Sequence, residues 1–191
     1  MNSRIVDRQR LAAVLIVLAA TLCVGAAEPY KRSLYRHWVD ADHDCQNTRV
    51  EVLIAESLVP VTLSANGCDV VSGQWLDACT GRTLTNPRLL DIDHMIPLKE
   101  VHLSGGDQWD ATRRQAYAND LEDERTLIAV SASANRAKAD KDPARWLPGN
   151  RPYLCTYIAN WIAVKERWEL SIDARERASI DRIQEDCREN G

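Results

Sequence analysis

Asp91, Asp93 and His94 stand close together at the end of an apolar segment. Residues 89–96 predict a strand, which Pro97 ends. Because side chains alternate along a strand, the two aspartates share one face, and the histidine points to the other unless the strand end twists. Carboxylates bind hard divalent cations, and a neutral imidazole is a good general base near pH 7. Residues of these types are suited to metal-assisted hydrolysis, but the stretch alone is weak evidence, and an isolated Asp-His pair favours a hydrogen-bonded aspartate and a surface histidine.

A second polar position follows another short apolar segment. Residues 127–130 predict a strand, and a serine after it is suited to cap a helix over 135–139. Asn135 and Lys138 are three residues apart, so they share one face of this helix. Strand, long loop, strand and helix, with Asp-His on the first strand and Asn on the helix, describe a ββα-metal finger.

The other elements predict an α+β fold, with a small antiparallel unit in the middle and helices around it. The clearest helix covers 153–170, where apolar side chains recur at helical spacing. Asp173 and Glu176 have the spacing of a capping box at the start of a last helix. Further elements are expected as a helix near 48–57, a strand over 69–76 and a helix within 108–118.

The N-terminus has the pattern of a secretory signal peptide. Three arginines precede an apolar run over 11–24, and Gly25-Ala26-Ala27 offers a cleavage site. We therefore predict a signal peptide over 1–27, a single domain over 28–191, and a secreted or periplasmic location. An uncleaved membrane anchor is the alternative.

The charge balance bounds the nucleic-acid functions that the chain could have. It carries 24 Lys+Arg and 28 Asp+Glu, a net charge of −4. Residues 1–27 hold three bases and one acid, so 21 bases and 27 acids remain after cleavage, a net charge of −6. This excludes a protein that coats nucleic acid by bulk charge. A nucleic-acid function would need a local basic site, and residues 125–151 contain a cluster of basic residues.

Five cysteines lie beyond the signal peptide. Export to an oxidising compartment favours disulfides with one cysteine left over. We predict the pairs Cys155–Cys187, which would join two C-terminal helices, and Cys45–Cys68. Cys79 would then be a free thiol.

The segment from Asp40 to Glu51 has a spacing typical of calcium loops. Counted from Asp40, carboxylates stand at positions one, three and five, and Glu51 stands at twelve. Position six is Cys45, where such a loop favours glycine. Calcium binding and a polar loop that caps the helix near residue 48 both remain open.

The central motifs together resemble the HNH, or His-Me finger, endonucleases. The likeness is greatest to secreted relatives of the C-terminal nuclease domain of GmrSD-type restriction enzymes. It covers most of the mature chain, with its core over about 88–146 and C-terminal helices over 153–187. The matching motifs are Asp93-His94-x-x-Pro97-Leu98, Ser104-Gly105, Trp109, Ala118-Asn119-Asp120, Asn135-Arg136-x-Lys138-x-Asp140, Pro143 and Trp146, and, further out, Trp38-x-Asp40-x-Asp42, Thr48-Arg49-x-Glu51-Val52-Leu53, Gly73-x-Trp75 and Trp161 to Lys165.

The resemblance implies a role for each candidate site residue. His94 would be the general base, and Asn119 would belong to the catalytic set by orienting the loop of that histidine. Asp93 and Asn135 would bind one divalent metal ion, with Mg²⁺ expected and Mn²⁺ as a substitute. The implied phosphate contacts are Arg136 and Lys138.

These observations favour an exported, monomeric, metal-dependent endonuclease with a nucleic-acid substrate, DNA more than RNA, and no stable membrane association after cleavage. A non-catalytic secreted binding module that keeps the fold is an alternative. A hydrolase with Cys79 as nucleophile and His94 as base is a third interpretation.

Overall fold

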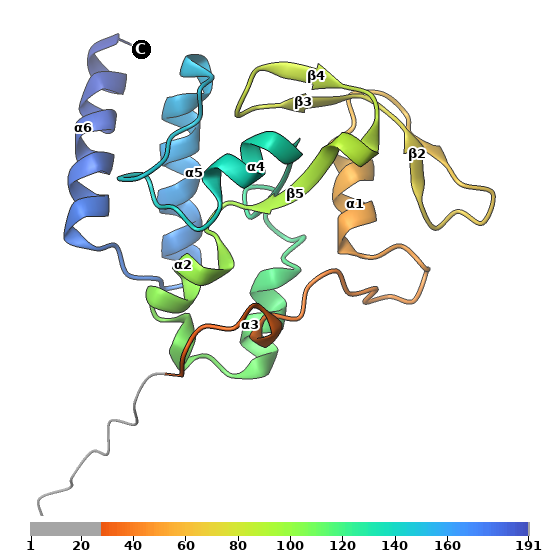
Figure 1. The fold of residues 1–191 in the computed structure, drawn as a ribbon, viewed down its shortest axis with the longest axis horizontal. Helices are drawn as coiled ribbons and strands as arrows, with labels where there is room; N and C mark the ends of the chain where they lie inside the picture. Colours follow the sequence, from red (N-terminus) through yellow and green to blue (C-terminus); the bar gives the residue numbers. More distant parts are fainter. Residues whose placement is uncertain (1–27, 191) are drawn as a thin grey trace, which may run out of the picture.

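The computed structural model describes residues 28–190, and the predicted signal peptide lies outside them. The fold is a mixed α+β arrangement with three two-stranded antiparallel sheets, as Figure 1 shows. Helices α5 and α6 stand at one end of the molecule, α1 and β2 stand at the other, and β5, α4 and the β3–β4 hairpin lie between them (Figure 1). The strands are β1 Thr62–Leu63, β2 Val70–Ser72, β3 Trp75–Asp77, β4 Arg82–Leu84, β5 Leu90–His94 and β6 Leu127–Ser131. The α-helices are α1 Thr48–Ala55, α2 Leu98–Leu103, α3 Ala111–Ala118, α4 Ala132–Lys138, α5 Leu154–Arg167 and α6 Ala174–Asn190.

Strands β5 and β6 pair along their whole length, and β6 leads directly into α4. The antiparallel register runs from Leu90 opposite Ser131 to His94 opposite Leu127. Ser131 ends β6 and also caps α4, because its side chain accepts a hydrogen bond from the Ala134 amide. The predicted order of strand, loop, strand and helix is therefore present.

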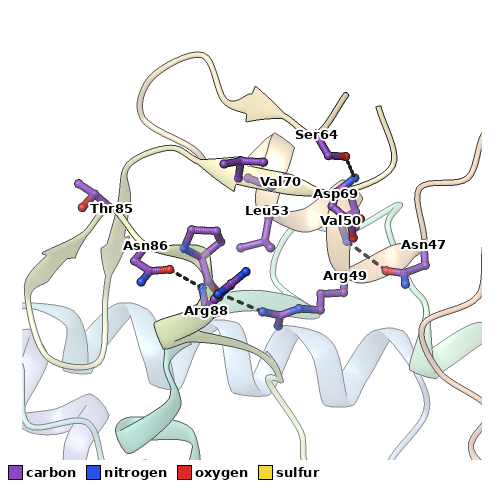
Figure 2. A pocket seen from close by; sticks show the side chains of 12 residues that line it. Asn47, Arg49, Val50, Leu53, Ser64, Asp69, Val70, Thr85, Asn86 and Arg88 are labelled. Carbon is purple, nitrogen blue, oxygen red and sulfur yellow. Dashed lines mark hydrogen bonds between the residues drawn. The ribbon is translucent and has the colours of Figure 1, made fainter. Parts of the chain in front are cut away.

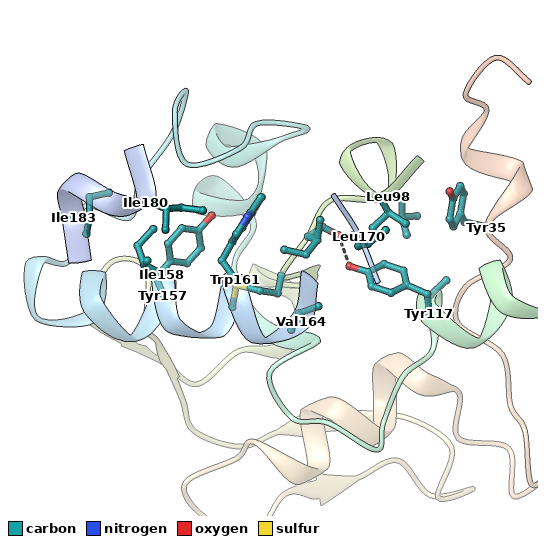
Figure 3. Packing of buried hydrophobic residues seen from close by; sticks show 14 residues of the cluster. Tyr35, Leu98, Tyr117, Tyr157, Ile158, Trp161, Val164, Leu170, Ile180 and Ile183 are labelled. Carbon is teal, nitrogen blue, oxygen red and sulfur yellow. Dashed lines mark hydrogen bonds between the residues drawn. The ribbon is translucent and has the colours of Figure 1, made fainter. Parts of the chain in front are cut away.

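Two hydrophobic cores hold this central unit from its two sides. One core lies among α2, α3, α5 and α6, and Figure 3 shows its aromatic rings packed between the helices. The other lies between α1 and one face of β5 and β6, and consists of Val52, Leu53, Trp75, Leu90, Ile92, Leu127 and Ala129. Met95 and Ile96, which follow β5 directly, belong to the first core, so the end of β5 is fixed where the two cores meet.

The C-terminal helix pair has the predicted cap and the predicted disulfide. Asp173 accepts hydrogen bonds from the amides of Arg175 and Glu176, and Glu176 accepts one from the Asp173 amide, so the capping box is complete. A disulfide joins Cys155, at the start of α5, to Cys187, near the end of α6. The two helices therefore run antiparallel.

The second disulfide and the free cysteine also agree with the prediction. Cys45, in the loop before α1, pairs with Cys68, in the turn between β1 and β2. Cys79 is free and buried. Burial, helped by the charges of Asp93 and Asp77, raises the pKa of the Cys79 thiol to about 12. A buried thiol with a raised pKa weighs against the interpretation of Cys79 as a nucleophile.

Two parts of the fold differ from the expectation. The predicted strand over 69–76 is two strands, β2 and β3, that belong to different sheets. The extended segment is interrupted at Gly73, where the Cβ atom of any other residue would lie 2.5 Å from the Trp75 ring. The sequence pattern does not predict helix α2. It indicates Pro97 only as the end of a strand, whereas Pro97 is also the N-cap of this helix.

Glu56, at the C-cap of α1, makes folding stability depend on pH. Its carboxylate accepts a hydrogen bond of 2.8 Å from the Ala129 amide of β6, and burial raises its pKa to about 7. Since the folded-state pKa is the higher one, ionisation of Glu56 costs no stability below about pH 4.5 and destabilises the fold progressively as pH rises through 7. We expect Glu56→Gln to stabilise the protein by about 1–3 kcal/mol at pH 8 and to have little effect at pH 4.5. Urea unfolding at the two pH values measures this.

The matched control for this experiment is Glu166→Gln, which removes an exposed carboxylate on α5. The control should shift neither unfolding curve. Equal stabilisation by both variants at pH 8 would contradict the assignment to Glu56, because it would indicate a general effect of net charge.

Candidate active site

Strand β5 presents Asp91 and Asp93 to helix α4, as alternation along a strand requires. The Asn135 side-chain amide donates a hydrogen bond of 3.1 Å to Asp91 Oδ2. One helical turn later, the Lys138 ammonium donates one of 2.6 Å to Asp93 Oδ2. Asn135 and Lys138 are separated by a helical rise of about 4.5 Å, and Asp91 and Asp93 by a strand rise of about 6.7 Å. These two separations are similar enough for both pairs to be in contact.

The predicted phosphate contact at Lys138 is wrong. Its side chain is only 1% exposed, and its ammonium also donates a hydrogen bond of 2.7 Å to the His94 backbone oxygen. The spacing that places Asn135 at the site also turns Lys138 inward, because the two residues share one helical face. Arg136 lies on the exposed side of α4, so its contact with phosphate stays a prediction.

The His94 ring lies on the other face of β5, away from the two aspartates. Its Nε2 is 3.1 Å from the Ala118 backbone oxygen at the end of α3. A carbonyl oxygen can only accept, so Nε2 carries the hydrogen and Nδ1 keeps its lone pair. The ring is stacked between Trp38 and Tyr117, at centroid distances of 5.6 and 5.9 Å. These contacts fix both the tautomer and the orientation of the imidazole.

Asn119 contacts neither His94 nor the aspartates and instead joins two segments of backbone. Its Oδ1 accepts hydrogen bonds from the Val39 amide and the Thr48 hydroxyl. Its Nδ2 donates to the backbone oxygens of Arg36 and Gln115. It therefore holds the segment that carries Trp38 against the end of α3, where the Ala118 oxygen contacts His94. Its position fits the orienting role implied by the resemblance.

Sequence reasoning missed the roles of Trp38 and Tyr117 at this site. Trp38 belongs to one of the motifs on which the resemblance rests, but it is 56 positions from His94, and no local pattern joins them. Its backbone φ of 58° lies in the left-handed region that favours glycine. The surrounding contacts, above all those of Asn119, hold this conformation.

Burial controls the charge states at the site. It lowers the pKa of His94 to about 3, so the imidazole is neutral at physiological pH. Burial also raises the pKa of Asp93, while the adjacent Lys138 ammonium opposes this shift. Two carboxylates facing a single ammonium leave the α4 side of β5 with a surplus of negative charge once both are ionised.

The donor atoms on this side suit a hard divalent cation. Asp91 and Asp93 each use one carboxylate oxygen in the contacts with α4, and Asn135 uses only its amide nitrogen. One oxygen of each side chain is left without a hydrogen-bond partner among residues 28–190. Carboxylate and amide oxygens are the ligands that Mg²⁺ and Mn²⁺ take in proteins. Asp91 is therefore a further candidate beside the two predicted ligands, and metal binding by this set stays a prediction.

The acidic loop before α1 gathers the carboxylates that its spacing suggested. One oxygen each from Asp40, Asp42 and Asp44 lies within 4.8 Å of the others. Burial and these three charges raise the pKa of Glu51. Asp40 Oδ2 accepts a hydrogen bond from the Cys45 amide, and Oδ1 has no hydrogen-bond partner in the described part of the chain. Calcium binding by this loop stays a prediction.

The fold and the site define an α+β protein in which carboxylates, an amide and a neutral imidazole gather around one strand. The chain matches the family model of the C-terminal domain of GmrSD restriction endonucleases over residues 61–180. It belongs to this family, a family of nuclease-related domains. The matched range contains β5, β6 and α4, and with them the side chains from Asp91 to Lys138.

The chain is also similar to a protein described as an uncharacterized secreted protein from Arthroderma benhamiae. The two are 35% identical over 164 residues, which cover 85% of this chain and 78% of that protein. No solved structure matches the chain significantly. The secreted relative and the two disulfides confirm the predicted export. Within residues 28–190, none of the helices combines the length and apolar character needed to cross a bilayer.

Proposed function

We propose that the protein is an exported, metal-dependent endonuclease of the HNH, or ββα-metal, type that hydrolyses phosphodiester bonds. The observation that carries this proposal is the His94 imidazole, which is neutral and oriented and whose Nδ1 has no hydrogen-bond partner among residues 28–190. It lies on the strand that also bears Asp91 and Asp93. Phosphodiester hydrolysis uses a general base and hard oxygen ligands for a metal ion, and β5 carries candidates for both on its two faces.

His94 acts as the general base. Its Nδ1 takes a proton from water, the resulting hydroxide forms a bond to phosphorus, and the ester P–O bond breaks. The departing oxygen takes a proton from solvent, and His94 returns its own to solvent. Burial keeps the imidazole neutral but also weakens it as a base. The negative charge of a bound phosphodiester would raise its pKa toward neutrality, since an opposite charge favours the imidazolium.

Asp91, Asp93 and Asn135 are the residues that would hold the divalent metal ion, with Mg²⁺ as the expected ion and Mn²⁺ as a substitute. When bound, the ion supplies a Lewis acid that stabilises negative charge on the phosphate and the leaving oxygen. Lys138 holds Asp93 and the His94 backbone in place, and its charge offsets part of the carboxylate repulsion.

The substrate is nucleic acid, DNA more than RNA, and the enzyme is a monomer without stable membrane association once residues 1–27 are removed. Arg136, exposed on α4 beside the ligand residue Asn135, is a contact for the substrate phosphate. Asn119 orients the surroundings of His94 without touching the substrate.

The purified mature chain should nick circular DNA in the presence of Mg²⁺ or Mn²⁺. EDTA should abolish nicking, and added Mg²⁺ should restore it, because the ligand oxygens alone cannot stabilise the leaving group. Gel assays on circular DNA, linear DNA and RNA measure this and establish the substrate preference. Cleavage of circular DNA distinguishes an endonuclease from an exonuclease.

If none of the three substrates is cleaved with either metal ion, the proposed nuclease activity is refuted. Binding of nucleic acid without cleavage would support the non-catalytic binding module instead. Cleavage that EDTA leaves unchanged would show that the reaction needs no metal ion, and the proposed role of His94 as general base would stand.

A further inference from the structure

A groove of about 780 Å³ opens beside the start of β5 (Figure 2). Its walls are α1, strand β2 with the turn before it, and the segment over 85–88 that leads into β5. Figure 2 shows the side chains of Arg49 and Arg88 between α1 and this segment. The proposed catalytic chemistry uses none of the residues that line it.

The two arginines give the groove an unpaired positive charge. Arg49 Nη2 donates hydrogen bonds of 3.2 and 2.9 Å to the backbone oxygens of Pro87 and Leu90. These contacts hold the guanidinium in place without neutralising it, because both acceptors are uncharged. Arg88 is exposed, and no carboxylate within residues 28–190 pairs with either arginine. Asp69, on the hairpin side, is the acid of the lining, so the net charge is +1.

Apolar side chains lie beside the guanidinium groups. Val50 and Leu53 of α1, Val70 of β2 and Pro87 contribute to the same lining. A fixed guanidinium binds phosphate through directed hydrogen bonds, and an apolar wall next to it accepts a sugar or a base. The lining therefore matches a chain in which phosphate groups alternate with less polar rings.

The groove lies at the start of β5, the strand that carries the candidate active-site residues. The Leu90 oxygen that Arg49 contacts directly precedes Asp91, which contacts Asn135 of α4. His94 is four residues further along the strand, about 13 Å away at 3.3 Å per residue. A polynucleotide cleaved at His94 extends beyond the scissile phosphate by this distance. An acidic protein needs such local positive charge to hold it.

We propose that this groove binds the sugar–phosphate backbone of the substrate strand that flanks the cleaved bond, with Arg49 and Arg88 as phosphate contacts. The proposal rests on the nuclease function and specifies how its substrate is held. Arg49 is also a structural residue, because it caps two backbone oxygens, so Arg88 is the residue to test.

The experiment measures binding of a fluorescein-labelled single-stranded DNA oligonucleotide to a His94→Gln background by anisotropy over a range of salt concentrations. We expect Arg88→Ala to weaken binding on the order of ten-fold and to reduce the slope of log K against log salt by about 0.7. Arg82→Ala, which removes an exposed arginine of β4 outside the groove, is the matched control and should change neither.

In the chain that keeps His94, Arg88→Ala should raise KM and leave kcat unchanged, because the lost contact is made equally in the ground and transition states. Equal binding by the Arg88→Ala and Arg82→Ala variants would overturn the proposal that the groove binds the substrate strand. An effect of Arg88→Ala on kcat alone would also overturn it. Absence of cleavage together with Arg88-dependent binding would refute the nuclease and retain the groove.

Discussion

His94→Ala should lower the rate of DNA cleavage by about 10²–10⁴, the contribution of a positioned general base. The imidazole is neutral, its Nε2 hydrogen is bound to the Ala118 oxygen, and the rings of Trp38 and Tyr117 stack with it. Only Nδ1 is left to accept a proton. Because the ring is also packed between aromatic side chains, the alanine variant loses packing as well as the base.

His94→Gln separates these two effects. A glutamine amide can still donate a hydrogen bond to the Ala118 oxygen, but it cannot accept a proton at neutral pH. We expect the glutamine variant to unfold near the wild-type temperature and to be as inactive as the alanine variant. Plasmid nicking rates and thermal unfolding give the two readouts.

The control is His43→Asn, at an exposed residue of the acidic loop whose left-handed backbone asparagine tolerates. It should keep full activity. Wild-type activity in the His94→Gln variant would show that this histidine has a structural role and that the base lies elsewhere.

Lys165→Met should destabilise the fold by about 3–5 kcal/mol, the cost of leaving a buried charge without its partner. The Lys165 ammonium of α5 is fully buried and contacts Glu100 of α2 at 2.9 Å and Glu176 of α6 at 3.0 Å. It also donates to the Ser104 hydroxyl and the Ser171 backbone oxygen. One cation thus joins three helices, and its removal leaves two buried carboxylates facing each other.

Two further variants test this explanation by urea unfolding. Lys99→Met removes the lysine of the exposed ion pair with Asp140, at 2.6 Å, and should cost no more than about 1 kcal/mol. Adding Glu100→Gln and Glu176→Gln to Lys165→Met should recover part of the lost stability, because no buried charge then remains. A Lys165→Met variant as stable as the Lys99→Met variant would contradict the network.

The features that could be predicted from sequence are those with short-range causes. Alternation along residues 89–96 correctly separated the two aspartates from His94. The position of a serine before the α4 helix, and the spacing of Asp173 and Glu176, correctly predicted two helix caps. Export and an odd cysteine count predicted disulfides with one thiol left over, and the two proposed pairs are present. Each of these patterns acts over a few residues or on composition.

The features that could not be predicted depend on contacts between distant segments. Whether Lys138 faces solvent or Asp93 depends on which side of α4 packs on β5, and helical spacing alone does not specify that side. Helix α2 has only six residues, too few for a clear period, and Glu100 within it contacts Lys165, 65 positions away. Its formation therefore depends on tertiary packing.

The sequence by itself determined the chemistry available to this protein: a histidine beside carboxylates on one strand, an asparagine on the following helix, and cysteines suited to export. The tertiary structure decided how that chemistry is arranged. It brings Trp38 and the Ala118 oxygen to His94, joins Asn135 to Asp91, and buries the ammonium of Lys138. The physical reason is that residue types are local properties, whereas burial, tautomer and ion pairing arise only when segments far apart in sequence pack together.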